Sequence, residues 1–449
     1  MKIILSLCCI LMSAQLFASS FLESVKKENW NGMEVVWIED NKFPKFTAMF
    51  YFEDGAMNDP FPGLTQTTLE QLTSGTTKES QKEIADFFDF YSAKLRSSVT
   101  HEYNLYTVSA LTKDIAPVMG KVCELFSEAQ YPEKEIKSYL SRAKSQLKNL
   151  VTSHAALADR IFRKVSLEET PFVNPTEGTL KSYDKMNNVL LKERLQQLNQ
   201  SSKRLYLTGP MEALEMKKII LKQCPWTSER HHTRVDIKKP QSQSSIYLVP
   251  VPGANQAQIR IGRYMTKSET SGKNDQLSFM SGFLGGGFTS KLVQELRVKR
   301  GLTYSAGAYA SIQKDYGRTG IMTFSKNETA AEVISLIRDI FQDTNNGKFT
   351  EKEFKHQQGH QIGGFAFGFE EGQAFLNQLM IYDHQGRKYE ELVSFPKTIS
   401  ELRPESLSQI SLEALAWDKL TIVVVGDKSL EKSLSRIRPV RILNYEDFL

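Results

Sequence analysis

The sequence predicts an α+β protein made of two similar domains, each a mixed or antiparallel sheet packed with helices. Runs rich in β-branched and aromatic residues, typical of strands, are interspersed with runs of helical periodicity. The order of these runs repeats at an offset of about 210 residues, which indicates an internal duplication. Between the copies, residues 224–245 are rich in Pro, Ser, Gln, His and Lys, as linkers are. We therefore expect one domain over residues 19–223 and a second over 246–449.

The first half opens with two expected strands, residues 33–38 and 45–53. Pro62-Gly63 then introduces a helix over 64–72, and Ser80 can cap a second helix that runs through Leu95. The other elements expected in this half are strands near 96–101 and 103–111, helices over 115–129, 133–151, 155–166 and 188–198, and a strand over 203–209.

The second half repeats this order. Strands over 246–250 and 257–263 correspond to the first two strands, and a helix over 275–283 corresponds to the first helix. The other elements expected here are a helix from Thr289, strands over 304–312, 320–325 and 420–426, and helices over 329–342, 350–359 and 407–415, with Thr350 as a cap.

Composition and the amino terminus bound the cellular setting. The chain has 449 residues, 40% hydrophobic and 24% charged, with a net charge of +5, which is typical of a soluble globular protein. The basic residues are dispersed, so nucleic acid is not predicted as a partner. Lys2, the apolar run over 3–12 and Leu16-Phe-Ala18 have the features of a cleavable signal peptide, residues 1–18. No segment is long and apolar enough to cross a bilayer, so we expect an exported, periplasmic protein.

The most informative stretch is LGGGFTSKLVQELRVKRGLTY, residues 284–304. Gly285, Gly286 and Gly287 predict a turn free of side chains, after which Thr289 or Ser290 can cap a helix. The turn lacks the Gly-Lys-Ser/Thr of a phosphate-binding loop.

Packing alone leaves two side chains of this stretch unexplained. Gly301 is expected to end the helix, which places Arg297 and Tyr304 on either side of a turn. The glycine-rich turn, the helix, Arg297, the Gly-Leu-x-Tyr sequence and Tyr304 occur together. In this combination the stretch resembles the C-terminal half of the pitrilysin/insulinase family of zinc peptidases.

The resemblance covers nearly all of the mature chain. It implies two α+β domains joined by a linker and folded towards each other around a cleft. It also implies that Arg297 and Tyr304 contact a substrate peptide at a metal centre in another domain. A guanidinium and a phenol suit this role, because both donate hydrogen bonds that can hold a scissile carbonyl and its developing oxyanion.

The zinc site of the family is missing. Active members carry H-x-x-E-H on the helix after the second strand, where two His bind zinc and the Glu is the general base. Gly63-Leu64 and Gly75-Thr76 align this motif without a gap. The aligned positions are Gln66 and Glu70 for the two His, and Leu69 for the catalytic Glu.

The third ligand is lost as well, because no Asp or Glu occurs from 136 to 158, where it is expected. We therefore expect no catalytic residue and no bound metal or other cofactor in this chain. Glu70 is interpreted as a solvated surface carboxylate.

The histidines and cysteines offer no clear replacement site. His356 and His360 are four residues apart, but Gly359 lies between them, which favours surface histidines; His231-His232 lie in the expected linker. Cys123 lies in an apolar helical pattern, so a buried free thiol is the default interpretation. A disulfide with Cys224 is the alternative in an oxidising compartment.

The resemblance implies the non-catalytic subunit of an exported, heterodimeric zinc metallopeptidase that acts on unfolded peptides. The catalytic partner would carry H-x-x-E-H and zinc. This chain would supply Arg297 and Tyr304, with Gly285–Gly287 shaping the chamber wall, and the peptide would add as a strand to a sheet edge in the partner. One alternative is a peptide-binding or assembly module without catalysis, in which Arg297 pairs with a carboxylate such as Glu295. Another is an active peptidase with an unusual metal site.

Overall fold

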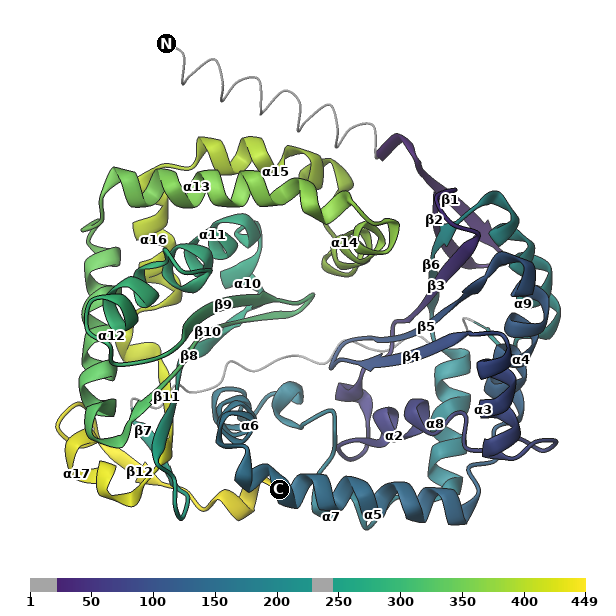
Figure 1. Ribbon diagram of the computed structural model, residues 1–449, viewed down its shortest axis with the longest axis horizontal. Helices are drawn as coiled ribbons and strands as arrows, with labels where there is room; N and C mark the ends of the chain where they lie inside the picture. Colours follow the sequence, from purple (N-terminus) through teal and green to yellow (C-terminus); the bar gives the residue numbers. More distant parts are fainter. Residues whose placement is uncertain (1–21, 228–244) are drawn as a thin grey trace.

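The computed structural model describes residues 22–227 and 245–449 and contains two six-stranded sheets (Figure 1). The expected signal peptide and most of the expected linker, with His231-His232, lie outside the described residues. The strand orders are β1-β2-β6-β3-β5-β4 and β12-β7-β11-β8-β10-β9, and five strands of each sheet correspond in order, which confirms the predicted fold class. The edge strands differ, because β1 is antiparallel to β2 whereas β12 is parallel to β7. The strands are β1 (Val25–Trp30), β2 (Met33–Glu39), β3 (Lys45–Phe52), β4 (Lys94–Val99), β5 (Asn104–Leu111), β6 (Lys203–Gly209), β7 (Ile246–Pro250), β8 (Gln256–Thr266), β9 (Ala306–Ile312), β10 (Tyr316–Lys326), β11 (Thr421–Gly426) and β12 (Val440–Ile442).

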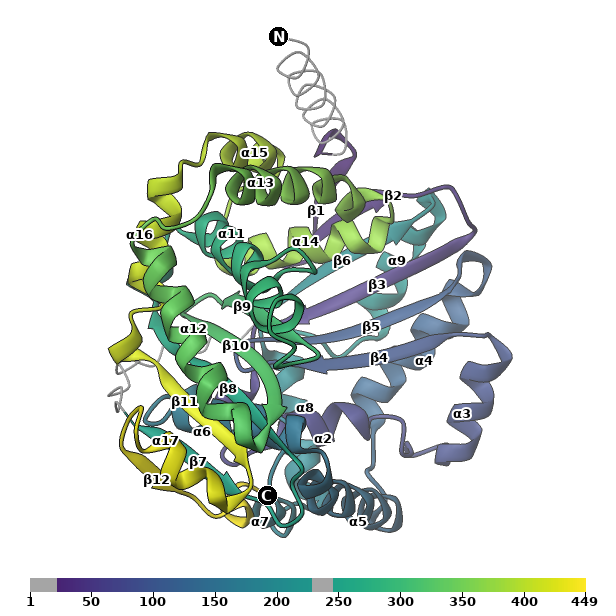
Figure 2. The same ribbon diagram turned by 60° about the vertical axis from the view of Figure 1, so that its left-hand side comes forward.

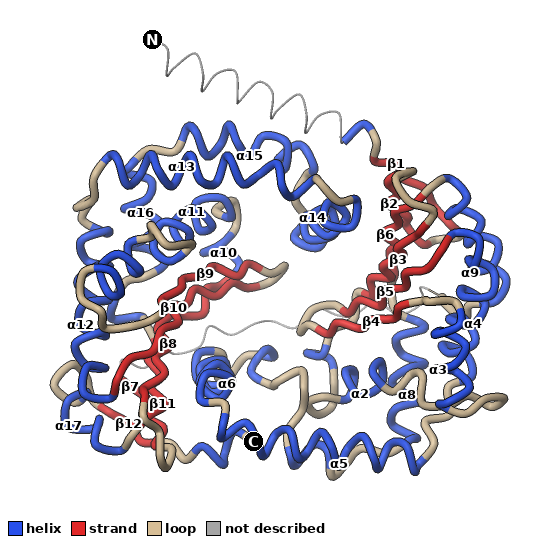
Figure 3. Tube along the Cα trace, in the orientation of Figure 1, coloured by secondary structure: helices blue, strands red, loops and turns tan. Residues whose placement is uncertain are grey.

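Helices form the outer layer of the molecule around both sheets (Figure 3). Each half has its own core, in which one face of the sheet packs against helices of the same half. The helices of the first half are α2 (Leu64–Glu70), α3 (Gln81–Phe90), α4 (Ile115–Glu128), α5 (Glu133–Asn149), α6 (His154–Ser166), α7 (Leu180–Tyr183), α8 (Asn188–Gln200) and α9 (Met216–Gln223). Those of the second half are α10 (Lys267–Thr270), α11 (Asn274–Gly285), the π-helix η6 (Val293–Val298), α12 (Ala330–Asn345), α13 (Glu351–Phe365), α14 (Gly372–Gln385), α15 (Tyr389–Glu401), α16 (Pro404–Ala414) and α17 (Glu431–Leu434).

Each half also covers the remaining sheet face of the other half with one helix. Helix α14 packs Phe375, Leu376 and Leu379 against the first sheet, over Met49 and Tyr206 (Figure 2). Helix α6 does the same for the second sheet, where Leu157 and Ile161 meet Val249 and Val423. Because burying each such side chain contributes about 1.5–3 kcal/mol, this exchange joins the two halves into one body.

Hydrogen bonds join the tips of two hairpins, one from each half. Glu102, in the turn between β4 and β5, accepts the backbone N–H groups of Lys314 and Asp315, each at 2.9 Å. The same carboxylate lies 2.8 Å from Nε2 of His384 on α14, whose Nδ1 lies 3.0 Å from the hydroxyl of Tyr51. The ring of His384 therefore joins both halves.

A second histidine is buried at the same junction. His101 Nε2 donates to the carbonyl of Asn174 at 2.7 Å, and its ring meets Phe172, which stacks on Tyr316 of the second sheet at 3.9 Å. Burial, opposed by the hydrogen bond to Asn174 and reinforced by the nearby cation of Arg163, lowers the pKa of His101 to about 4. The folded protein therefore holds this ring neutral.

Most predicted elements exist, with differences that have local causes. The helix capped by Ser80 has the capping box with Glu83 but ends at Phe90, since the chain reverses at Ser92 with a positive φ of 49°. Helices α14 and α15 were missed. Pro396 inside α15 argues against a helix, and the apolar residues of α14 pack on the sheet of the other half rather than on elements next to them in the sequence.

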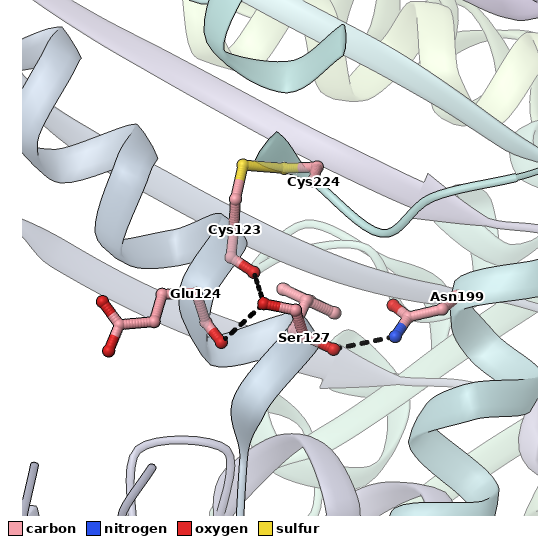
Figure 4. The surroundings of a disulfide bond; sticks show 6 residues. Cys123, Glu124, Ser127, Asn199 and Cys224 are labelled. Atoms are coloured by element: carbon pink, nitrogen blue, oxygen red, sulfur yellow. Dashed lines mark hydrogen bonds between the residues drawn. A yellow bond between two sulfur atoms is a disulfide. The ribbon is translucent and has the colours of Figure 1, made fainter. Parts of the chain in front are cut away.

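A disulfide joins Cys123 on α4 to Cys224, just after α9 (Figure 4). The buried free thiol favoured from the sequence is therefore wrong, and the alternative is present. Trp226 packs 4.6 Å from the ring of Phe50, and the Thr227 N–H donates to the carbonyl of Asn199. The first residues of the expected linker thus pack on the first half. In the part of the chain that the structure describes, no helix is long and apolar enough to span a membrane.

Removing the disulfide should destabilise the first half. The bond closes a loop with a sequence separation of 101 residues, and closure of such a loop restricts the unfolded chain. We expect the double variant Cys123→Ser/Cys224→Ser to lose about 2–5 kcal/mol in free energy of unfolding by urea titration. Wild-type protein in a reducing agent should show the same loss, and equal stability of oxidised and reduced protein would contradict the prediction.

Acid should destabilise the fold through His101. An unfolded chain binds the histidine proton near its ordinary pKa of 6.5, but the folded chain binds it only near 4. Between these values the unfolded state holds more protons, so stability is complete above 6.5 and falls as pH drops towards 4, by up to about 3 kcal/mol. His101→Gln should flatten this part of the stability profile, whereas the exposed control His360→Gln should not. Parallel wild-type and His101→Gln profiles would exclude this role.

Candidate functional site

The predicted helix after the glycine-rich turn is real but differs from expectation. Neither Thr289 nor Ser290 caps it, since the Ser290 hydroxyl donates to the carbonyl of Gly287 and Thr289 pairs with a histidine. It takes π-helical form over Val293–Val298 and ends at Gly301, whose φ of 63° allows the reversal. Such wide turns are common at functional sites, because they re-aim side chains relative to a regular helix.

Arg297 and Tyr304 come together as the sequence predicts. The guanidinium carbon of Arg297 lies 4.6 Å from the ring centre of Tyr304 and 5.6 Å from that of Phe288. Both rings are on the surface, with 73% of Tyr304 and 63% of Phe288 exposed. Phe288 was not predicted as a site residue. Its position directly after the three glycines is the feature of the sequence that could have indicated it.

The alternative of a binding or assembly module supposed that Arg297 pairs with Glu295, and the structure shows no such pair. The Glu295 carboxylate is taken by Lys299 at 2.6 Å and by Arg300 at 2.7 Å. Across residues 22–227 and 245–449, the only partners of the Arg297 guanidinium are the two aromatic rings. Its N–H donors therefore remain open for a ligand, while the rings hold its plane in place.

The glycines and one side chain position this group. A Cβ on Gly285 would lie 2.2 Å from the backbone N of Ala308, so glycine is needed where α11 touches β9. Gln294 Nε2 donates to the carbonyl of Phe288 at 2.7 Å, which fastens the turn to η6. The turn is thus a fixed connection, and it places Phe288 against Arg297.

Helix α2, which carries the positions aligned with the zinc motif, is held by a buried ion cluster. Arg194 of α8 donates two hydrogen bonds to Asp54, at 2.8 and 2.9 Å, and lies 3.0 Å from Asp59. Asp59 in turn accepts the N–H of Thr65 in the first turn of α2, where a carboxylate is favoured by the helix dipole. The position of α2 is therefore fixed independently of any metal.

The three degenerate positions have taken up other roles. Leu69 is 2% exposed and belongs to the core of the first half. Gln66 Nε2 donates to one oxygen of Glu70 at 2.7 Å, and the hydroxyl of Tyr139 on α5 donates to the other at 2.7 Å. Glu70 is thus exposed, as predicted, but held on both sides. Tyr139 was missed, because nothing in the sequence indicates which residue of α5 faces α2.

These residues do not fit a zinc ion. One carboxylate remains, a neutral amide and a phenol occupy its surroundings, and the general-base position is an apolar core residue. Nowhere in the described residues do three or more His, Cys, Asp or Glu side chains gather as metal ligands would. His356 shares a hydrogen bond with Thr289 at 3.0 Å.

The comparisons with known proteins agree with this fold. Residues 203–359, which include the glycine-rich turn, Arg297 and Tyr304, match the family model "Peptidase M16 inactive domain". The fold is that of an M16 inactive domain from Pseudomonas fluorescens, with a TM-score of 0.79 and 18% identity over 90% of this chain and 98% of that chain. It also matches the periplasmic protease PqqL from Escherichia coli, with a TM-score of 0.71 and 14% identity over 90% of this chain and 46% of that one.

The curated relatives are named as zinc proteases or as a non-peptidase homologue. An uncharacterised zinc protease of Streptomyces coelicolor is 21% identical over 72% of each chain, and a shorter match covers 36% of each chain with one of Mycobacterium leprae. A "non-peptidase homolog" of Helicobacter pylori is 19% identical over 89% of this chain and 93% of that one. The resemblance to inactive members of the pitrilysin/insulinase family, recognised from the sequence, is thus confirmed, because residues 203–359 match an inactive M16 peptidase domain.

Gly285 and Gly287, at the two ends of the glycine-rich turn, provide a matched pair for testing whether the turn is fixed by its contact with β9. An alanine Cβ at Gly285 would also lie 2.6 Å from the carbonyl carbon of Gly307, whereas one at Gly287 would meet nothing within 4 Å. Gly285→Ala should therefore lower the free energy of unfolding by about 1–3 kcal/mol, and Gly287→Ala should leave it nearly unchanged. Urea titrations of both variants check this, and equal effects would contradict it.

Proposed function

We propose that this chain, which carries an inactive M16 domain, is the non-catalytic subunit of an exported, heterodimeric zinc metallopeptidase that cleaves unfolded peptides. The partner subunit carries H-x-x-E-H and zinc, and this chain contributes Arg297 and Tyr304 to the partner's active site. The observation that carries the proposal is the Arg297 guanidinium, held between two exposed rings with its donors free.

The geometry of these donors suits carbonyl recognition. An unpaired arginine is expensive to fix in place unless it has a ligand, because its long side chain loses rotamer freedom. Here Phe288 and Tyr304 fix the guanidinium plane before a ligand arrives. The planar guanidinium can then donate hydrogen bonds to a carbonyl oxygen of the peptide next to the scissile bond. Because the donors are already in position, they stabilise negative charge that develops on that carbonyl oxygen.

Tyr304 adds a second donor from the same surface. Its ring is exposed and packs on Arg297, so its hydroxyl is directed by the same stack. When bound in the partner, zinc supplies an activated water. This chain binds and orients the peptide, and it donates hydrogen bonds to the carbonyl oxygens of the peptide.

Two observations support a second subunit and an exported location. This chain covers 46% of the longer periplasmic protease, so a second chain of similar size would complete an equivalent assembly. The Cys123–Cys224 disulfide suits an oxidising compartment, in agreement with the signal peptide expected over residues 1–18.

Substitution of Arg297 tests the proposal in the two-chain complex. We expect Arg297→Ala, reconstituted with a zinc-bearing M16 chain from the same organism, to lower kcat for peptide hydrolysis by about a hundredfold to a thousandfold. Arg300→Ala is the matched control, because Arg300 lies three residues away and pairs with Glu295. It should leave kcat unchanged, and size-exclusion chromatography should show that both variants bind the partner.

Unchanged turnover in Arg297→Ala would refute the assigned role. A chain that binds peptides but forms no complex with any zinc-bearing partner would instead favour the non-enzymatic binding module.

A further inference from the structure

The former metal site holds a carboxylate that is fixed but has no cationic partner. Gln66 and Tyr139 donate one hydrogen bond to each oxygen of Glu70, and both donors are neutral. Among residues 22–227 and 245–449, no lysine, arginine or histidine forms an ion pair with Glu70. An exposed glutamate normally samples many rotamers, so two short bonds that hold this one in place indicate a preorganised anion.

The charge of Glu70 acts on two phenols, those of Tyr139 and Tyr183. Burial and then the negative charge of Glu70 raise the pKa of Tyr139, and the same two causes, in the same order, raise the pKa of Tyr183 to about 12. Both phenols therefore lie within electrostatic range of the carboxylate. Arg160, whose charge also acts on Tyr183, is paired with Glu177 at 2.7 Å, and Lys144 of α5 is paired with Asp184 at 2.6 Å.

Three acceptors remain in this cluster once its internal bonds are made. A carboxylate only accepts, so the Gln66 amide must donate through Nε2, and its Oε1 is left as an acceptor. Tyr139 spends its one proton on Glu70, and its oxygen keeps the capacity to accept. Together with Glu70 itself, the cluster offers two neutral oxygens and one charged group.

We propose that Gln66, Glu70 and Tyr139 form a recognition site for an ammonium group of a bound peptide, either a lysine side chain or the amino terminus. An ammonium carries three N–H donors and one positive charge, which matches the acceptors left in the cluster, and aromatic rings favour a cation beside them. A divalent metal is a poorer match, because the cluster offers it a single anionic ligand. That the ligand is a peptide rests on the proposed function, whereas the ammonium chemistry does not.

The fixed position of the helix makes the site usable. The Asp59 and Arg194 cluster fastens the first turn of α2, and the hydroxyl of Tyr131 donates to the carbonyl of Thr68 at 3.1 Å. Leu69 anchors the opposite face in the core. Glu70 is therefore presented from a rigid element, and binding need not order it first.

Binding to the full isolated chain tests the inference without a partner or hydrolysis. The probes are acetyl-Ala-Ala-Lys-Ala-Ala-amide, the same peptide with acetyl-lysine, and Ala-Ala-Ala-Ala-Ala-amide with a free amino terminus. By isothermal titration we expect the lysine probe or the free-amine probe to bind and the acetyl-lysine probe not to bind. Which of the two binds identifies the source of the ammonium.

Glu70→Gln should weaken that binding by about tenfold or more, since it removes the charge and keeps the shape. Glu133→Gln is the matched control: Glu133 is an exposed glutamate on α5 that pairs with Lys137, and its loss should have no effect. Tyr139→Phe should weaken binding less than Glu70→Gln, because it removes an acceptor but no charge. Thermal melts show that each variant is folded.

Equal affinity of Glu70→Gln and wild type would overturn the inference, as would equal binding of the acetyl-lysine probe or no binding of either amine at millimolar concentration. Competition by zinc chloride would likewise overturn it in favour of a metal. These binding measurements need no catalytic partner. They can therefore refute the ammonium site while Arg297→Ala still lowers turnover in the complex. Equally, the ammonium site can be confirmed while Arg297→Ala leaves turnover unchanged.

Discussion

The constraint on which the structure depends is the exchange of one helix between its halves. Each sheet has two apolar faces, but each half has enough helices to cover only one of them. Helix α14 closes the first sheet and α6 closes the second, so each half completes the core of the other. Exposed sheet faces of this size would otherwise promote association, and the exchange buries them within one chain. The duplicated sequence therefore folds as a unit.

This exchange also fixes the geometry that function requires. Helix α14 carries His384 to Glu102, and Glu102 holds the hairpin tip at Lys314 and Asp315. The orientation of the second sheet relative to the first is set by these buried polar contacts as well as by apolar packing. Buried hydrogen bonds are directional, so they select one arrangement among the many that apolar faces alone would permit. Groups on the two halves, such as Arg297 and Glu70, are thereby kept at a constant separation.

The sequence predicted what local chemistry determines and missed what long-range packing determines. Strand propensity, the repeat and the caps at Ser80 and Thr350 are local signals, and the elements that they predict are present. The pairing of Arg297 with Tyr304 follows from a turn of fixed length. The bond from Tyr139 to Glu70 and the partners of His384 could not be predicted, because these residues lie 69 residues or more apart along the chain. Helix α14 was missed for the same reason, because its apolar residues pack against a sheet in the other half.

The positions aligned with the zinc motif are held in place by contacts that need no metal. The zinc site that the resemblance implies for active members would tie α2 to the later helix. Here the bond from Tyr139 to Glu70 links those two helices, and Leu69 adds apolar packing where a general base would face the metal. Because Arg194, Asp54 and Asp59 already hold the first turn of α2, losing the metal need not have cost the fold its geometry. Catalytic ligands could therefore change while Arg297, on the other half and on an independent turn, kept its donors free. A domain whose scaffold does not depend on a metal can change the residues at that site and still hold exposed donors such as those of Arg297 in place.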